Sequence, residues 1–209
     1  MRHCPVLLLL MAVAAVPAHS GVIVNTFGPG DAYQTGIGYT LGYAGSAYSQ
    51  GHAFAPASTV TLDQIEVAIG LVSGPNELLV WVMTDSSGEP GSVIESWAFS
   101  GAMGAFGNLN PPLVGSSVLH PLLSGGTQYW LIAGTPTDAT WAVWNFNSIG
   151  HTASIARRQG AGSWETVTDV TTAAFRISSY EGAIPEPGTW CLVLAGIALL
   201  GARRLVQAR

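Results

Sequence analysis

The chain has 209 residues, of which 9% are charged, and its formal net charge is −5. Residues 21–183 hold eleven acidic residues and three arginines, a net charge of −8, which makes nucleic acids and anionic surfaces poor partners. The chain has no lysine for a Schiff base or a P-loop, and its two cysteines, Cys4 and Cys191, lie near its ends. The body therefore has no disulfide, thiol nucleophile or thiolate metal site.

The N-terminal segment has the parts of a secretory signal. Arg2 and His3 precede an apolar run over residues 6–16 that is too short to span a membrane, and small residues follow it up to Ser20. These features predict a signal peptide over residues 1–20, removed by signal peptidase on export. A signal anchor that stays attached to the protein is the alternative.

Residues 21–183 have the length of one domain with a real core. The chain contains 26 glycines and 12 prolines, so turns are frequent, and the body shows no convincing amphipathic helix. Short apolar or alternating runs between turn residues are typical of strands. The sequence predicts an all-β fold, a single β-sandwich or jelly-roll domain flanked by an N-terminal signal peptide helix and a C-terminal hydrophobic anchor helix.

About ten strands are expected in this body. Ile65, Val67 and Ile69 are spaced by two, which places them on one buried face. Residues 78–83 are apolar on both faces, as expected of a central strand, and the turn residues 85–91 predict a hairpin. The expected strands are 22–27, 60–69, 78–83, 93–99, 117–119, 128–133, 141–146, 154–157, 164–167 and 173–178.

The residue types that carry catalysis are scattered. His52, His120 and His151 do not have the spacing of a zinc protease, and no Gly-x-Ser-x-Gly nucleophile elbow is present. The loop 85–89 could offer oxygens to calcium, but it lacks alternating acidic positions and is interpreted as a hairpin turn. We therefore predict no catalytic residue, no metal site and no cofactor.

One pair of carboxylates has the character of a glycosidase acid and base. Asp63 and Glu66 are three residues apart, but nothing in the sequence indicates that they face a common cleft. We interpret them as solvated surface residues.

Three tryptophans are the candidate ligand-binding residues of the body. Trp141, Trp144 and Trp164 lie among amide side chains, a mixture that could stack on and hold sugar rings. Packing in the sandwich core is the alternative and the more ordinary role of large aromatic residues. Trp141 and Trp144 are three residues apart, so a strand would point them to opposite faces, with at most one in the same core. The stretch rich in glycine and tyrosine over residues 33–48, which we call the Gly/Tyr stretch, could likewise either bind a ligand or pack in the core.

A distinct C-terminal segment covers residues 184–209. Its first part is Pro185, Glu186, Pro187 and Gly188. The prolines keep the residues before them out of helical conformation, so this part stays extended and accessible.

The second part of this segment suits a membrane. Trp190 has the amphipathic ring favoured at the interface, and an apolar run ends at Arg203 and Arg204. A helix over residues 189–202 would rise about 21 Å, short of the ~30 Å hydrocarbon core. The arginines are expected on the cytoplasmic side, which leaves the body outside. A short hydrophobic helix packed on a protein core is the alternative.

This order of parts resembles the PEP-CTERM sorting signal of Gram-negative, exopolysaccharide-producing bacteria. The resemblance implies recognition by an exosortase-type membrane protease while the chain is anchored in the inner membrane. It further implies removal of the tail and delivery to the cell surface or the extracellular matrix.

Several short segments of the body form a second recognisable pattern: residues 48–50 with Phe54, 62–69, 80–85, 89–91, 123–131 and 174–177. With these segments the body resembles the choice-of-anchor ectodomains found upstream of bacterial sorting tags. The resemblance implies a β-sandwich and brings no catalytic residue.

Taken together, these features predict a non-enzymatic, exported protein with a structural or adhesive role at the cell surface or in the exopolysaccharide matrix of a biofilm. A carbohydrate-binding module for matrix polysaccharide is the alternative, and a polysaccharide hydrolase is a more distant one.

Overall fold

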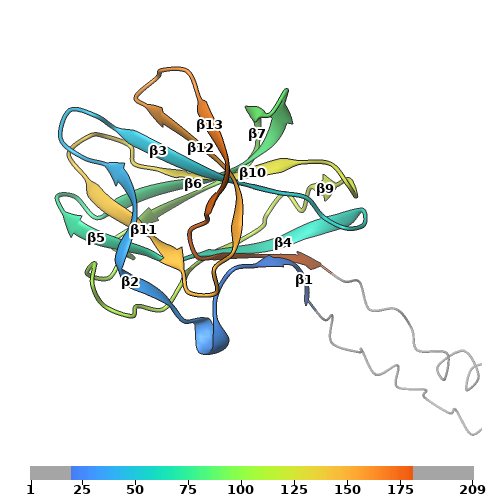
Figure 1. Ribbon diagram of the computed structural model, residues 1–209, viewed down its shortest axis with the longest axis horizontal. Coiled ribbons are helices and arrows are strands. Elements are labelled where there is room, and N and C mark those ends of the chain that lie inside the picture. The colour runs from blue at the N-terminus through green and yellow to red at the C-terminus, as the bar shows by residue number, and fades with distance from the viewer. Residues whose placement is uncertain (1–19, 181–209) are drawn as a thin grey trace, which may run out of the picture. The chain divides into compact units, whose positions relative to one another are not determined.

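The computed structural model describes residues 20–180, and the predictions on both terminal segments lie outside this range. The described body is an all-β sandwich of two antiparallel sheets (Figure 1), which confirms the predicted fold class. A 3₁₀ turn, η1 (Pro29–Asp31), follows the first strand. The strands are β1 (Ser20–Asn25), β2 (Tyr33–Gly42), β3 (Tyr48–Phe54), β4 (Val60–Val67), β5 (Ile69–Ser73), β6 (Glu77–Ser86), β7 (Glu89–Ser100), β8 (Leu113–Ser116), β9 (Leu122–Leu123), β10 (Tyr129–Gly134), β11 (Trp141–Asn147), β12 (Thr152–Gln159), β13 (Glu165–Thr171) and β14 (Phe175–Tyr180).

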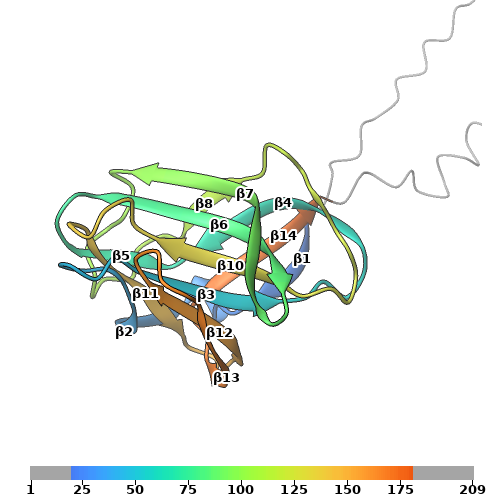
Figure 2. The same cartoon turned by 90° about the horizontal axis from the view of Figure 1, so that it is seen from above.

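The two sheets differ in size. The small sheet has the strand order β1-β14-β4-β8, and β9 also pairs with β4. The large sheet has the order β5-β11-β2-β3-β10-β6-β7, and the β12–β13 hairpin joins it by pairing with β3. Figure 1 shows this hairpin at the top of the body, with β1 and β4 of the small sheet at the bottom, and Figure 2 shows it at the edge of the body next to β3 and β11.

The main core fills the space between the sheets. As predicted, Ile65, Val67 and Ile69 all point into it, with exposures of 0%, 0% and 3%. The chain passes from the small sheet to the large one between Val67 and Ile69. Ala68 at this crossing donates to the Ala174 carbonyl and accepts from the Asn145 amide, so its backbone groups are satisfied where neither sheet pairs them.

A second apolar cluster lies on the opposite face of the large sheet. Every residue of β10 is buried, because Leu131 and Ala133 face the main core while Trp130 and Ile132 face this cluster. Ala156 of β12, which pairs with β3, belongs to this cluster, and Trp164 packs against it. The stability of the body comes from packing on both sides of this sheet.

Most predicted strands are present, with the hairpin between β6 and β7 where it was expected. The prediction of a strand at residues 117–119 is wrong, because β8 ends at Ser116 and the next residues form a loop around Glu95. The predicted set also lacks β2, which lies in the Gly/Tyr stretch, β3, which begins at its last residue, and the short strands β5, β8 and β9. Glycine and polar residues in β2 and β3 mask the alternation that marks strands elsewhere.

Candidate functional site

The structure separates the three predicted tryptophans. Trp144 is fully buried in the main core, where its indole Nε1 donates to the Ala174 carbonyl at 3.1 Å. Its ring packs edge-on against His52 and Phe175. The prediction that Trp144 binds glycan is therefore wrong, because no ligand reaches a ring enclosed by the core. Trp141 is partly exposed and not in that core, in agreement with the expectation that at most one of the two is buried there.

Trp164 lies just before β13 and belongs to a different region from Trp141. The guanidinium carbon of Arg158 sits 4.5 Å from the centroid of the Trp164 ring, a cation–π geometry. Trp164 also packs against the second apolar cluster. One face of this ring thus already has a partner within the body.

Trp141 lines a cleft of about 320 Å³ that we call the aromatic cleft. The loop between β2 and β3, the end of β5, and the loop between β10 and β11 converge on it. Its lining residues are Tyr43, Ala44, Gly45, Ser73, Asp138, Ala139 and Trp141.

Two aromatic rings form one wall of the aromatic cleft. The Tyr43 and Trp141 rings meet edge to face, with centroids 4.9 Å apart and an interplanar angle of 64°. This is a preferred arrangement for aromatic pairs. Tyr43 is 45% exposed, so a large apolar surface remains open to solvent beside the buried part of the pair.

The backbone holds Tyr43 in an unfavourable conformation. Its φ is +77°, in the left-handed region that bulky residues rarely adopt. The Tyr43 amide donates to the Thr140 carbonyl at 2.8 Å, and the Ser46 amide donates to the Tyr43 carbonyl at 2.9 Å. Gly42 before it also has a positive φ, and a Cβ there would lie 2.0 Å from the Thr140 oxygen. The chain thus turns sharply at the end of β2 and carries an aromatic residue at a position that favours glycine.

The cleft also holds a carboxylate. Asp138 Oδ2 accepts a hydrogen bond from the Gly45 amide at 3.1 Å, which ties the two loops together across the cleft. The indole Nε1 of Trp141 is shielded from solvent and has no hydrogen-bond partner among the described residues. Flat apolar faces beside a carboxylate suit a ligand that is apolar on one side and rich in hydroxyl groups on the other.

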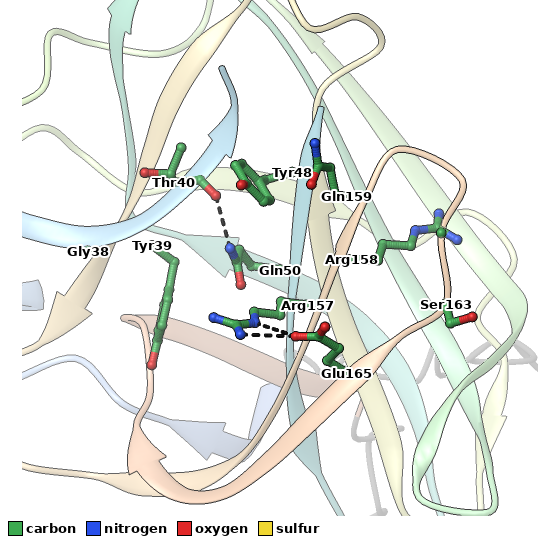
Figure 3. A pocket seen from close by; sticks show the side chains of 11 residues that line it. Gly38, Tyr39, Thr40, Tyr48, Gln50, Arg157, Arg158, Gln159, Ser163 and Glu165 are labelled. Atoms are coloured by element: carbon green, nitrogen blue, oxygen red, sulfur yellow. Dashed lines mark hydrogen bonds and ion pairs between the residues drawn. The ribbon is translucent and has the colours of Figure 1, made fainter. Parts of the chain in front are cut away.

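A larger pocket lies where β2 and β3 diverge, and we call it the fork pocket. The two strands share one residue pair, Gly42 with Tyr48. Beyond it β2 pairs with β11, while β3 is bordered by β12. The pocket has a volume of about 670 Å³ (Figure 3). Its lining residues are Gly38, Tyr39, Thr40, Tyr48, Gln50, Arg157, Arg158, Gln159, Gly162, Ser163 and Glu165.

Polar side chains replace the missing strand pairing in the fork pocket. Gln50 donates from Nε2 to the Thr40 carbonyl at 3.1 Å and so links β3 to β2. Arg157 donates from Nε and Nη2 to Glu165 Oε2, both at 3.0 Å (Figure 3). Among the residues that line this pocket Glu165 is the one carboxylate, and it is already paired. Retaining and inverting glycosidases typically use two carboxylates about 5–10 Å apart.

The three histidines noted in the sequence have different partners in the structure. His52 is fully buried, and burial, with a smaller contribution from the charge of His151, lowers its pKa to about 3. His151 Nδ1 is 3.0 Å from Thr172 Oγ1, and His120 Nδ1 is 3.2 Å from the Leu62 carbonyl oxygen. Within residues 20–180, no three His, Cys, Asp or Glu side chains converge in a way that could hold a metal ion.

The loop after β6 is a hairpin turn organised by Asp85. Its carboxylate accepts from the Gly88 amide at 3.0 Å, from Gln128 Nε2 at 2.7 Å and from Trp130 Nε1 at 2.8 Å. Burial raises the pKa of Asp85, but these three hydrogen bonds outweigh it and lower the pKa below its usual value. The carboxylate thus stabilises the turn and anchors it to β10.

The interpretation of Glu66 as a solvated carboxylate is wrong. Glu66 is 7% exposed and is bound by Arg176 of β14. Asp63 is partly exposed and lies at an irregularity in the pairing of β4 with β14. Because Glu66 is already paired with Arg176, the two carboxylates are not arranged as a free acid and base.

The predicted sorting residues lie outside the described residues: Pro185, Glu186, Pro187, Gly188, Trp190, Arg203 and Arg204. Residues 183–206 match the family model of the PEP-CTERM protein-sorting motif, which covers all of them. The chain carries a PEP-CTERM motif. No curated protein and no solved structure matched the chain.

The PEP-CTERM motif establishes the route of the protein in outline. Proteins with this motif are exported and associated with the membrane or the cell surface, and the motif implies processing by an exosortase. Between Ser20 and Tyr180 no helix is both long and apolar enough to cross a membrane.

The sequence does not predict the aromatic cleft as a unit, although it marks Trp141 and the Gly/Tyr stretch, which contains Tyr43, as candidates for ligand binding. Nothing in the sequence marks Asp138, because its loop meets the loop of Tyr43 only in the tertiary structure.

Proposed function

We propose that the body is a non-enzymatic adhesive or structural protein of the cell surface or exopolysaccharide matrix, and that it holds matrix glycan in the aromatic cleft. The observation that carries the proposal is Tyr43, kept at a φ of +77° against Trp141 and beside Asp138. Strained backbone of this kind persists where the surrounding structure enforces it, and it is concentrated at ligand-binding sites. A glycine at this position would avoid the strain but would supply no ring.

The chemistry of the cleft suits a sugar. The C–H faces of a pyranose pack on aromatic rings, and its hydroxyl groups donate to a carboxylate such as that of Asp138. A volume of about 320 Å³ accommodates a single sugar ring and is at the lower end of ordinary ligand pockets. The cleft is therefore suited to one residue of a longer chain.

The charge of the body indicates which glycans are favoured. Residues 21–183 have a net charge of −8, and Asp138 adds a negative charge at the cleft itself. Anionic polysaccharides are repelled by such a surface, whereas neutral ones are not. We expect neutral hexose-containing polymers to bind better than uronic-acid polymers.

Two features support binding rather than hydrolysis. Asp138 is the one carboxylate among the residues that line the aromatic cleft. The fork pocket offers Glu165, which is engaged by Arg157. A polysaccharide hydrolase needs an acid and a second carboxylate converging on the glycosidic bond, so we propose that the cleft retains glycan without cleaving it.

The test is calorimetric titration of the exported protein with the exopolysaccharide of the source organism and with a panel of neutral and anionic oligosaccharides. Trp141→Ala and Tyr43→Ala are expected to reduce affinity at least tenfold, and Asp138→Asn several-fold. Trp164→Ala is the matched control, because it removes a tryptophan outside the cleft and should leave affinity within twofold. Equal binding by Trp141→Ala, or no binding to any glycan, would contradict the proposal, and newly formed reducing ends would instead indicate a hydrolase.

A further inference from the structure

The loop between β8 and β9 presents aliphatic side chains to solvent. Val118 is 82% exposed and Leu119 is 67% exposed, and Leu122 at the start of β9 is also 67% exposed. Single exposed aliphatic residues are ordinary. Three within five residues of the chain form a local apolar surface, which we call the apolar ridge.

The strand register places the apolar ridge beside the last strand of the body. Leu122 pairs with Thr61 of β4, and Thr61 pairs on its other side with Tyr180 of β14. Directly paired residues point to the same face of a sheet, so Leu122 and Tyr180 share a face. Tyr180 is 51% exposed, and its ring centroid is 6.2 Å from that of His120 in the loop. Tyr180 therefore extends the apolar ridge.

A buried carboxylate holds the loop of the ridge in place. Glu95 of β7 is 5% exposed, and its Oε1 accepts from the Val118 and Leu119 amides at 2.7 and 3.1 Å. Its Oε2 accepts from Ser117 Oγ at 2.6 Å, and Ser117 Oγ in turn accepts from the His120 amide at 2.9 Å. The backbone of the loop is thus fixed, and the two aliphatic side chains project outward from a rigid support. Presenting them to a partner costs little conformational entropy.

The ridge lies where the chain leaves the body. Ser20, the first described residue, pairs with Tyr180, the last one, so the row Ser20, Tyr180, Thr61, Leu122 crosses four adjacent strands. Figure 1 shows β9 and the exit of β14 on the same side of the body. The match to the PEP-CTERM motif begins at residue 183. Trp190 follows Tyr180 by ten positions in the sequence, which gives a reach of at most about 36 Å.

We propose that the apolar ridge inserts shallowly into the lipid interface while the PEP-CTERM segment still anchors the chain. Exposed aliphatic side chains with a tyrosine beside them match the composition of interfacial contacts. The short link to the anchor keeps the ridge at a high effective concentration near the lipid, so a weak intrinsic affinity is sufficient. The contact would set the orientation of the body. The loops that form the aromatic cleft lie on the side of the body opposite β9 (Figure 1), so the cleft would face away from the membrane.

Charge determines which lipid the ridge prefers. The body is acidic, so anionic headgroups repel it, and the carboxylate of Glu95 is covered by its three donors and does not face the lipid. We therefore expect insertion into zwitterionic interfaces. This contact does not depend on glycan binding in the cleft.

The experiment uses the full chain with Cys4 and Cys191 replaced by serine, reconstituted in phosphatidylcholine vesicles. A cysteine at Leu119 (Leu119→Cys) carries an environment-sensitive fluorophore, and Thr137→Cys, in the exposed loop between β10 and β11, is the matched control. The label at 119 is expected to shift its emission to the blue and to be quenched by brominated lipid at least threefold more than the label at 137. Adding Val118→Ser and Leu122→Ser should reduce that difference by half or more.

Two outcomes would overturn the membrane contact. In the first, aqueous iodide quenches the fluorophores at positions 119 and 137 equally, and brominated lipid quenches neither of them. The other is a blue shift at 119 that depends on protein concentration and not on brominated lipid, which would assign the ridge to a second copy of the chain. Because all substituted ridge residues are exposed, the fold should be retained, and circular dichroism of each variant checks this.

Discussion

Arg176 on β14 lies directly opposite Glu66 on β4, and its guanidinium donates to both carboxylate oxygens. A further hydrogen bond of 2.9 Å reaches Asp31 in η1, so one cation links two strands of the small sheet to the turn after β1. The bond with Glu66 and, after it, the pairing with Asp31 outweigh burial and raise the pKa of Arg176. Arg176 thus stays charged. Its positive charge compensates the negative charge of Glu66, which is buried with an exposure of 7%.

Arg176→Met should destabilise the body by about 3 kcal/mol, because it leaves the buried carboxylate of Glu66 without a partner. The measurement is the free energy of unfolding in urea. Arg157→Met is the control, since the Arg157–Glu165 pair has side-chain exposures of 58% and 68% and such surface pairs contribute at most about 1 kcal/mol. Similar losses for the two variants would show that Glu66 is not held by this pair.

His52 should make the stability of the body depend on pH. Its folded pKa is about 3, below the ordinary value of 6.5, so between these values the unfolded chain binds a proton that the folded chain does not. The stabilisation is complete above pH 6.5 and is lost as the pH falls toward 3, by about 1.4 kcal/mol per pH unit.

The variant His52→Leu removes this proton uptake, so its free energy of unfolding should fall less steeply than that of the wild type between pH 6.5 and 5. Urea denaturation at several pH values measures both slopes. The two slopes are compared between pH 6.5 and 5 because most surface carboxylates titrate below this range. Parallel slopes would mean that His52 takes up a proton in the folded state.

Tyr43 should be a site where stability and binding oppose each other. Tyr43→Gly and Tyr43→Ala both remove the ring beside Trp141, but only glycine adopts a φ of +77° without strain. We expect the glycine variant to be more stable than the alanine variant by about 1 kcal/mol, with both losing glycan affinity. Thermal unfolding compares the two, and equal melting temperatures would argue against strain at this residue.

The PEP-CTERM motif gives a prediction about processing. Replacing Pro185, Glu186 and Pro187 with alanine should block the exosortase step, because alanine does not impose the extended conformation that the sequence predicts here and that a protease cleft accepts. Mass spectrometry and fractionation of cells should find the uncleaved chain in the membrane. Conversion of Arg157 to alanine, far from the motif in sequence, should leave processing unchanged. Normal cleavage of the triple variant would contradict the role of these residues.

Local patterns in the sequence predicted much of the fold. The period-two spacing of Ile65, Val67 and Ile69 and the turn residues after Asp85 are short-range signals, and the structure confirms both. Strand β2 was missed because its burial follows no clean alternation, and the strand predicted at residues 117–119 is a loop. There the bonds to Glu95, which comes from the other sheet, outweigh the β-propensity of the aliphatic residues.

Residues 183–206 alone indicate that the chain is exported and associated with the membrane or the cell surface. This is possible because a sorting enzyme recognises a contiguous segment, and the folded body is not needed for that recognition. The aromatic cleft is different. That Trp144 is enclosed while Trp141 lines a cleft with Tyr43 and Asp138 depends on contacts between three loops that lie far apart in the chain. Burial and ring contacts arise from the packing of two sheets. The spacing of Trp141 and Trp144 on one strand indicates that they point to opposite faces, but it does not indicate which of them lines a binding site.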